Sequence, residues 1–276
     1  MRSLGIFLVF IYSYSGNAQN QGILGSPIAE IRINELDLIS FDTKDQLFVS
    51  NTSGDIYLFN KEGKQQNLFS PARQGRLDQL EAARTVSVFS FSSDLQEYRV
   101  LDRFLNPLAE NGFSFSEVNL AKAATLGNNH VVWVWDESDM TLKSLDYLRG
   151  ALIQSQPLNL ISGSEALDVT EIREFKNRLF MNVPASGVFI FDNQGNLMRK
   201  IEVKGIRKLC YYKEHLLWLD GTVLKAISLT SYDILVIFEL GTEMPDYLQI
   251  GQERIALVSD GRVALYPIPQ ALRSLE

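Results

Sequence analysis

The sequence predicts an all-β fold, a β-propeller of about six four-stranded blades. A phrase of 17 residues, LFVSNTSGDIYLFNKEG at 47–63, recurs without a gap as LFMNVPASGVFIFDNQG at 179–195. Weaker copies of the pattern follow one another at a mean spacing of about 42 residues, which is typical of one propeller blade. Helical periodicity is weak along the whole chain. Together these observations favour a ring of repeated antiparallel sheets; the main alternative is an array of two-sheet sandwiches.

Each copy of the phrase predicts two strands and the tight turns around them. An apolar run is followed by a break ending near Gly54 or Gly187, a second apolar run, and a polar Asn/Asp-x-x-Gly turn. Glycine and asparagine tolerate the positive φ angles that such turns need. Polar turns followed by apolar runs locate further blades at Val131, Leu216 and Ile255, and a degenerate copy runs through residues 86–89. The two clear copies then belong to the first and fourth blades.

The last blade lacks a strand at the C-terminal end of the chain. Strands are predicted at 255–258 and 263–266, after which Pro267 and Pro269 stop the pattern, because proline cannot donate to a sheet ladder. Residues 28–33, IAEIRI, alternate loosely between apolar and polar side chains. We expect this N-terminal strand to join the last blade and close the ring, which removes open sheet edges. Helical turns are expected only in loops, at residues 77–83 and 120–124.

Residues 1–18 are predicted to be a signal peptide. Arg2 provides the positive charge, residues 4–11 are apolar, and small residues, Gly16 and Ala18, stand where a signal peptidase cleaves. A retained membrane anchor is the alternative, but the apolar run of about eleven residues is short for a bilayer span. We therefore expect a single propeller domain at 19–276, with no transmembrane segment in the mature chain. Its expected location is the periplasm, cell surface or extracellular space of a bacterium.

Composition restricts the partners and the chemistry. The formal net charge of −7 argues against nucleic acid, because binding to phosphates relies on a basic surface. The only cysteine, Cys210, lies in an apolar run and reads as a small buried side chain on a strand. His130 and His215 both precede a strand of the repeat and read as turn residues. The carboxylates at 136–139 could ligate calcium, but they lack the spacing of a known calcium loop.

No catalytic, cofactor-binding or metal-binding residues are predicted, and no cofactor is expected, because nucleotide-binding and nucleophile-elbow motifs are absent. The most distinctive departure from the repeat is an insertion at 71–84, and long loops on a rigid scaffold often carry binding sites. A solvated connector whose leucines cap the blade edge is the alternative. The candidate partner-binding residues are Arg73, Arg76, Leu77, Asp78, Leu80 and Arg84.

The phrase at 54–63, with its approximate copy at 187–195, resembles the blade hairpins of quinoprotein-like and NHL-type bacterial propellers. The resemblance implies the propeller fold. The polar and metal-ligating residues that hold the quinoprotein cofactor have no counterpart here. Similar exported propellers include the scaffold lipoprotein of the barrel-assembly machinery, which implies a protein-binding role, although no cysteine here could carry its lipid.

The leading hypothesis is a non-enzymatic, exported scaffold that binds another protein of the bacterial cell envelope. One alternative is a glycan-active hydrolase or lyase that uses carboxylates in the propeller channel. Another is a propeller that binds a sugar or other small ligand without turnover. The sequence leaves the oligomeric state open.

Overall fold

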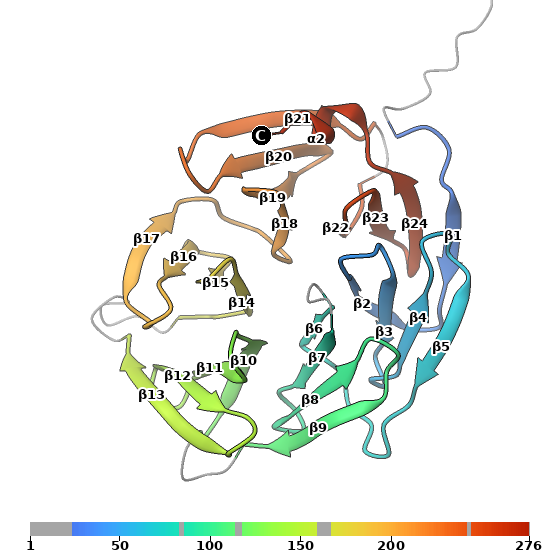
Figure 1. Cartoon of the computed structure of the whole chain (residues 1–276). Helices are drawn as coiled ribbons and strands as arrows, with labels where there is room; N and C mark the ends of the chain where they lie inside the picture. The colour runs from blue at the N-terminus through green and yellow to red at the C-terminus, as the bar shows by residue number, and fades with distance from the viewer. Residues whose placement is uncertain (1–23, 83–85, 114–117, 159–166, 242–243, 276) are drawn as a thin grey trace, which may run out of the picture.

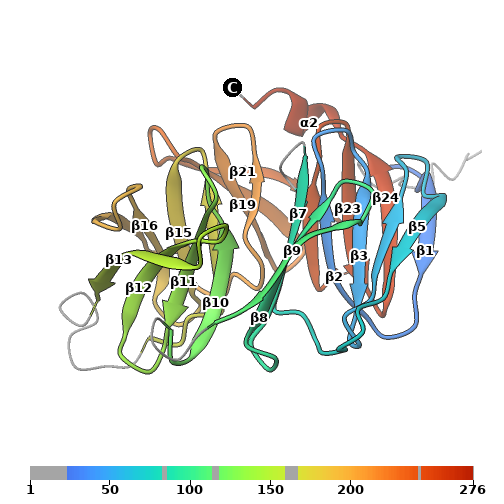
Figure 2. The ribbon, with the colours of Figure 1, turned by 60° about the horizontal axis from the view of Figure 1, so that its bottom comes forward.

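A computed structural model describes residues 24–82, 86–113, 118–158, 167–241 and 244–275. Its strands form six antiparallel sheets of four strands each, set around a central axis like the blades of a propeller (Figure 1). Figure 2 shows the ring from the side, with the blades standing next to one another around it. The predicted all-β propeller of six blades is confirmed.

The four strands of each blade have the following order in the sheet, from the central axis outward. Blade 1 contains β2 (Leu36–Phe41), β3 (Leu47–Asn51), β4 (Ile56–Phe59) and β5 (Gln65–Phe69). Blade 2 contains β6 (Gln79–Glu81), β7 (Ser87–Ser92), β8 (Glu97–Asp102) and β9 (Pro107–Gly112). Blade 3 contains β10 (Ala121–Leu126), β11 (Val131–Asp136), β12 (Thr141–Asp146) and β13 (Ala151–Pro157). Blade 4 contains β14 (Glu171–Phe175), β15 (Arg178–Val183), β16 (Gly187–Phe191) and β17 (Leu197–Ile201). Blade 5 contains β18 (Cys210–Tyr212), β19 (His215–Asp220), β20 (Val223–Ser228) and β21 (Ile234–Glu239). Blade 6 contains β22 (Tyr247–Ile250), β23 (Arg254–Ser259), β24 (Arg262–Pro267) and, outermost, β1 (Ala29–Arg32).

The ring is closed by the N-terminal strand, as predicted. β1 pairs antiparallel with β24, with Ile31 opposite Val263, so the first and last strands of the propeller lie in one sheet. Ile31 is buried in the cluster shared by blades 6 and 1. Beyond β24 the chain ends in a short helix, α2 (Gln270–Arg273), which packs against blade 5.

The two copies of the repeated phrase form equivalent hairpins in blades 1 and 4. Leu47 pairs with Phe59 in one, and Leu179 pairs with Phe191 in the other. Gly187 has a φ angle of +124°, and a Cβ atom there would lie 2.2 Å from the carbonyl oxygen of Ile201. Glycine is therefore required at position 187 for two local reasons, a positive φ angle and a close approach of neighbouring backbone.

The hydrophobic core lies between the blades. Six clusters of buried side chains each join two neighbouring blades. Trp133 and Trp135 project from one face of β11 and pack with Leu179 and Met181 of blade 4, so these indoles contribute to the packing between blades. Cys210 is a buried free thiol on β18, as expected, and burial raises its pKa to about 12.

Two expectations for local structure are wrong. Residues 79–81 and 121–126 form the innermost strands β6 and β10, where loop helices were predicted. An innermost strand is covered by neighbouring blades on both faces, so its apolar residues need not alternate with polar ones. The sequence pattern there loses the period of two that would identify a strand.

The alignment of the two histidines is also wrong, by one residue. His130 lies in a turn with a φ angle of +63°. His215 instead opens β19 and pairs with Ser228, the last residue of β20. Its counterpart in blade 3 is Val131, which opens β11 and pairs with the last residue of β12. Gly127 donates to Val131 across three intervening residues, whereas Tyr212 pairs with His215 across two, so the tight turn before β11 is one residue longer. Sequence spacing did not reveal this difference.

Candidate functional site

The two ends of the propeller differ in what closes them. We call the end where the innermost strands begin the connector face, because the links from one blade to the next lie there. The end where the innermost strands finish is the pocket face. No helix in the described parts of the chain is long and apolar enough to span a bilayer.

The middle of the channel is filled by polar side chains from several blades. The backbone of Leu209 is their meeting point: its N–H donates to Glu171 (2.8 Å), and its carbonyl accepts from Arg173 (3.0 Å) and Gln249 (3.1 Å). Nearby, Gln79 Nε2 donates to the carboxylate of Glu81 at 2.5 Å. All five of these side chains are buried. Gln79 Nε2 also donates to the backbone carbonyl of Ile172 at 3.4 Å, so blades 2, 4, 5 and 6 are linked through hydrogen bonds at the axis.

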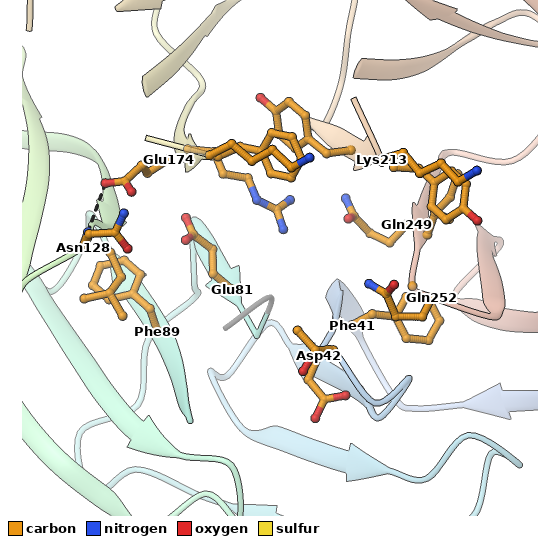
Figure 3. Close-up of a pocket in the computed structure, with 18 residues that line it drawn as sticks. Phe41, Asp42, Glu81, Phe89, Asn128, Glu174, Lys213, Gln249 and Gln252 are labelled. Atoms are coloured by element: carbon orange, nitrogen blue, oxygen red, sulfur yellow. Dashed lines mark hydrogen bonds between the residues drawn. The ribbon is translucent and has the colours of Figure 1, made fainter. Parts of the chain in front are cut away.

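Above this filled section, the channel opens on the pocket face into a cavity of about 530 Å³. It is lined by the C-terminal parts of the six innermost strands, by the turns that follow them, and by Phe89 of β7 (Figure 3). The lining comprises Phe41, Asp42, Thr43, Glu81, Phe89, Leu126, Asn128, Arg173, Glu174, Phe175, Lys176, Tyr211, Tyr212, Lys213, Gln249, Ile250, Gly251 and Gln252. A cavity of this size with polar groups converging on it is the usual form of a small-ligand site.

Hydrogen bonds between blades hold the rim of this pocket. The carboxylate of Asp45 accepts from the backbone N–H groups of Gln252 (2.6 Å) and Glu253, which joins blades 1 and 6. The backbone N–H of Asn128 donates to Glu174 at 3.2 Å, which joins blades 3 and 4. The rim is therefore ordered without a ligand.

The remaining cations of the rim are also engaged by protein groups. Lys176 forms an ion pair with Glu214 of blade 5. Lys213 donates to the backbone carbonyls of Arg273 and Leu275 in the C-terminal segment. Both ammonium groups therefore already have partners within the protein, and neither is left unpaired to bind an anion.

Gly251 shows how closely the rim is packed. A Cβ atom at this position would lie 2.1 Å from Oδ1 of Asp45 and 3.2 Å from the ring of Phe41. The absence of a side chain allows the turns of blades 1 and 6 to meet at the pocket edge.

The carboxylate of Asp42, which lines the pocket, is shielded from water. Asp42 is buried, and burial raises its pKa, although the backbone N–H groups of Lys44 and Gln46 donate to it at 2.8 Å and oppose that shift. Asp94, Asp102, Asp220 and Asp260, which lie at strand ends or in turns, are not among the described residues that line the pocket.

The predicted partner-binding segment lies mainly on the connector face. Arg76 forms a bidentate pair with Asp37 of blade 1 (2.8 and 2.9 Å), and Arg73 pairs with Glu97 of blade 2. Leu77 and Leu80 are buried between blades 1 and 2. Asp78 accepts from the backbone N–H of Ser93 at 2.6 Å.

Arg84 lies outside the described residues, as does the predicted signal peptide at 1–18. The segment at 71–84 is thus not one surface loop, because it includes the innermost strand β6.

Two carboxylates of the acidic turn at 136–139 bind the ammonium group of a lysine. Asp136 accepts from Lys143 at 2.6 Å, and Asp139 accepts from the same ammonium at 2.9 Å. No group of three or more His, Cys, Asp or Glu side chains suited to a metal ion occurs within the described ranges.

The fold and this pocket define the chain as a six-bladed β-propeller with a ligand-sized cavity at one end of its channel. It is similar to the WD40 domain of Pan2 from Neurospora crassa, at 12% identity, with a TM-score of 0.58 and coverage of 89% of this chain and 86% of that one. It is also similar to streptogramin B lyase, at 12% identity, with a TM-score of 0.59 and coverage of 88% and 87%.

BamB from Moraxella catarrhalis matches 88% of this chain and 85% of its own at 12% identity, but its TM-score of 0.44 is too low to support an argument. No known protein family and no curated protein sequence matches the chain. The structural similarities are similarities of fold.

Proposed function

We propose that this protein is a non-enzymatic, exported β-propeller that acts as a scaffold for another protein of the bacterial cell envelope. The observation that carries this proposal is the outer edge of blade 5. There β21 begins with Ile234, Leu235 and Val236, whose side chains are 58%, 38% and 69% exposed. β21 is the last strand of its sheet, so one side of its backbone has no strand partner in that sheet.

Four of the other five outer strands are protected against such contacts, and β21 is not. β13, the fifth, also exposes Leu152 and Ile153, but it continues with the polar residues Gln154, Ser155 and Gln156. β5 begins Gln-Gln-Asn, β9 begins with proline, β17 contains Arg199 and Lys200, and β1 contains Glu30 and Arg32. Polar, charged and proline residues on edge strands prevent unwanted pairing. β21 has no such residue before Glu239. An exposed apolar edge of this kind suits a partner protein that adds an extended, apolar segment as a further strand.

The test is a charged substitution on this edge. Val236→Lys should abolish recovery of the partner with the tagged propeller from envelope extracts of the native host. The matched control is Leu68→Lys, which places the same charge at an exposed position on the outer strand of blade 1. Both variants should keep the thermal midpoint of the parent protein. Equal recovery of the partner with both variants would contradict binding at β21.

The segment at 71–84 is a second surface for the same function. Arg73 and Arg76 remain exposed while their ion pairs hold them in place, so they present an ordered basic edge on the connector face. Because residues 79–81 form β6, a deletion there would damage the fold. Arg73→Glu is the sharper test, and loss of the partner with this variant but not with Val236→Lys would place the partner on the connector face.

A further inference from the structure

We propose that the cavity on the pocket face is a binding site for a neutral, polyhydroxylated ligand of the sugar class. This inference goes beyond the scaffold function, because the pocket and the edge of β21 are separate surfaces. The cavity of about 530 Å³ lies within the range of small-molecule sites.

The described residues of the lining carry no net formal charge. Three carboxylates, Asp42, Glu81 and Glu174, are balanced by three cations, Arg173, Lys176 and Lys213. As described above, protein groups already engage both lysines. A phosphate or carboxylate ligand would need a surplus of cations to replace its hydration. The balance favours a ligand without formal charge.

The floor of the pocket offers donors and acceptors side by side. Arg173 is buried, and its only hydrogen bond within the described residues runs from Nη1 to the carbonyl of Leu209. A guanidinium has five N–H donors, so most of them are available to a ligand. Gln249 also donates to Leu209, through Nε2, which leaves its side-chain carbonyl as an acceptor. A hydroxyl group both donates and accepts, and it can bridge such a pair.

The walls of the pocket contribute apolar faces. Phe41, Phe175 and Tyr212 line it, and the last two are only half-buried. The face of an aromatic ring suits the C–H face of a sugar ring, while hydroxyls around that ring reach polar groups at its edge. Figure 3 shows Asn128, Gln249 and Gln252 around the same opening. Amides next to aromatic walls are the side chains that such a ligand requires.

The ordered rim lowers the cost of binding. The hydrogen bonds that Asp45 accepts from blade 6, and the one that Asn128 donates to Glu174, fix the turns before any ligand enters. A site arranged in advance loses less conformational entropy when it binds.

Isothermal titration of the mature chain with glucose, N-acetylglucosamine, cellobiose and N,N′-diacetylchitobiose tests the proposal. Glucuronate and glucose 6-phosphate serve as anionic probes. At least one neutral sugar should bind saturably, with a Kd of about 1 mM or tighter. Gln252→Leu should weaken that binding tenfold or more, because its exposed side chain lines the pocket.

The matched control is Gln65→Leu, an exposed glutamine on the outer strand of blade 1, which should leave the affinity unchanged. Arg173→Met should also weaken binding, and its thermal midpoint reports whether the fold is intact. The proposal is overturned if no neutral sugar binds saturably, if only the anionic probes bind, or if Gln252→Leu and Gln65→Leu bind equally well.

Discussion

Lys143 Nζ lies 2.6 Å from Oδ2 of Asp136, and both side chains are buried in the hairpin of blade 3. Blade 5 has a related pair at the same place in its hairpin, Lys225 with Asp220 at 2.5 Å, but there the two side chains are accessible to water. The two blades therefore provide a buried ion pair and an exposed one in similar backbone settings.

Removing the buried cation should destabilise the protein strongly. Lys143→Met leaves Asp136 ionised and buried without its main partner, so we expect a loss of about 3–5 kcal/mol in the free energy of unfolding. Lys225→Met should cost at most about 1 kcal/mol, because exposed pairs contribute little. Urea denaturation of both variants measures the difference. Similar losses in the two variants would show that burial of the pair is not what matters.

The same pair predicts a pH dependence. Burial alone would raise the pKa of Asp136, but hydrogen bonds from Lys143, Ser138 and two backbone N–H groups outweigh burial and lower the pKa to about 2. The unfolded value is higher, so the ionised carboxylate stabilises the fold above about pH 4. This contribution, about 2 kcal/mol, is lost as the pH falls through about 2.

Unfolding free energies of the parent and of Asp136→Asn, measured from about pH 7 downward, should therefore converge as the solution becomes acidic. A gap between the two proteins that stays constant with pH would mean that Asp136 does not titrate as described.

Two glycines separate the effect of backbone angle from that of crowding. Gly150 has a φ angle of +64° with nothing near its missing Cβ, whereas Gly187 has both a positive φ angle and the carbonyl of Ile201 at 2.2 Å. Gly150→Ala should cost about 1–2 kcal/mol, the usual penalty of the left-handed region. Gly187→Ala should cost roughly 3 kcal/mol or more, because backbone must also move. Thermal and urea unfolding would test the order, and equal costs would contradict it.

The closing strand provides a further test. Ile31→Ala should lower the free energy of unfolding by about 2–4 kcal/mol, because it removes a side chain that is 4% exposed from the core between blades 6 and 1. Ile28→Ala, at an exposed position just before β1, is the control and should change little. If β1 were dispensable, both variants would unfold at the same urea concentration.

The parts of the fold that sequence reasoning predicted are those governed by local turn chemistry. Gly54, Gly187 and the Asn/Asp-x-x-Gly turns mark the hairpins because their backbone angles admit few residue types. The innermost strands β6 and β10 were not predicted, because burial on both faces removes the alternation of apolar and polar residues that identifies a strand. The alignment of His130 was wrong for a related reason. The turn before β11 contains one extra residue, and the pattern of apolar residues does not reveal it.

The pocket could not be predicted because its residues meet only when the ring is closed. Asp42 and Gln252 stand at opposite ends of the sequence and face one cavity in the fold. One signal was available: apart from Phe89 of β7, each described pocket residue lies in the C-terminal part of an innermost strand or just beyond it. Because two of those strands were not identified, the positions could not be aligned across the six blades.

The pairing of β1 with β24 also determines when the protein can finish folding. The two strands are roughly 230 positions apart, and contacts at such separation slow folding because a long stretch of chain must be ordered first. During synthesis β1 emerges early and then waits, with Ile31 unburied, until the last hairpin of the sequence exists. Any truncation that removes β24 therefore leaves the first strand without a partner, and the ring is completed only when both strands are present.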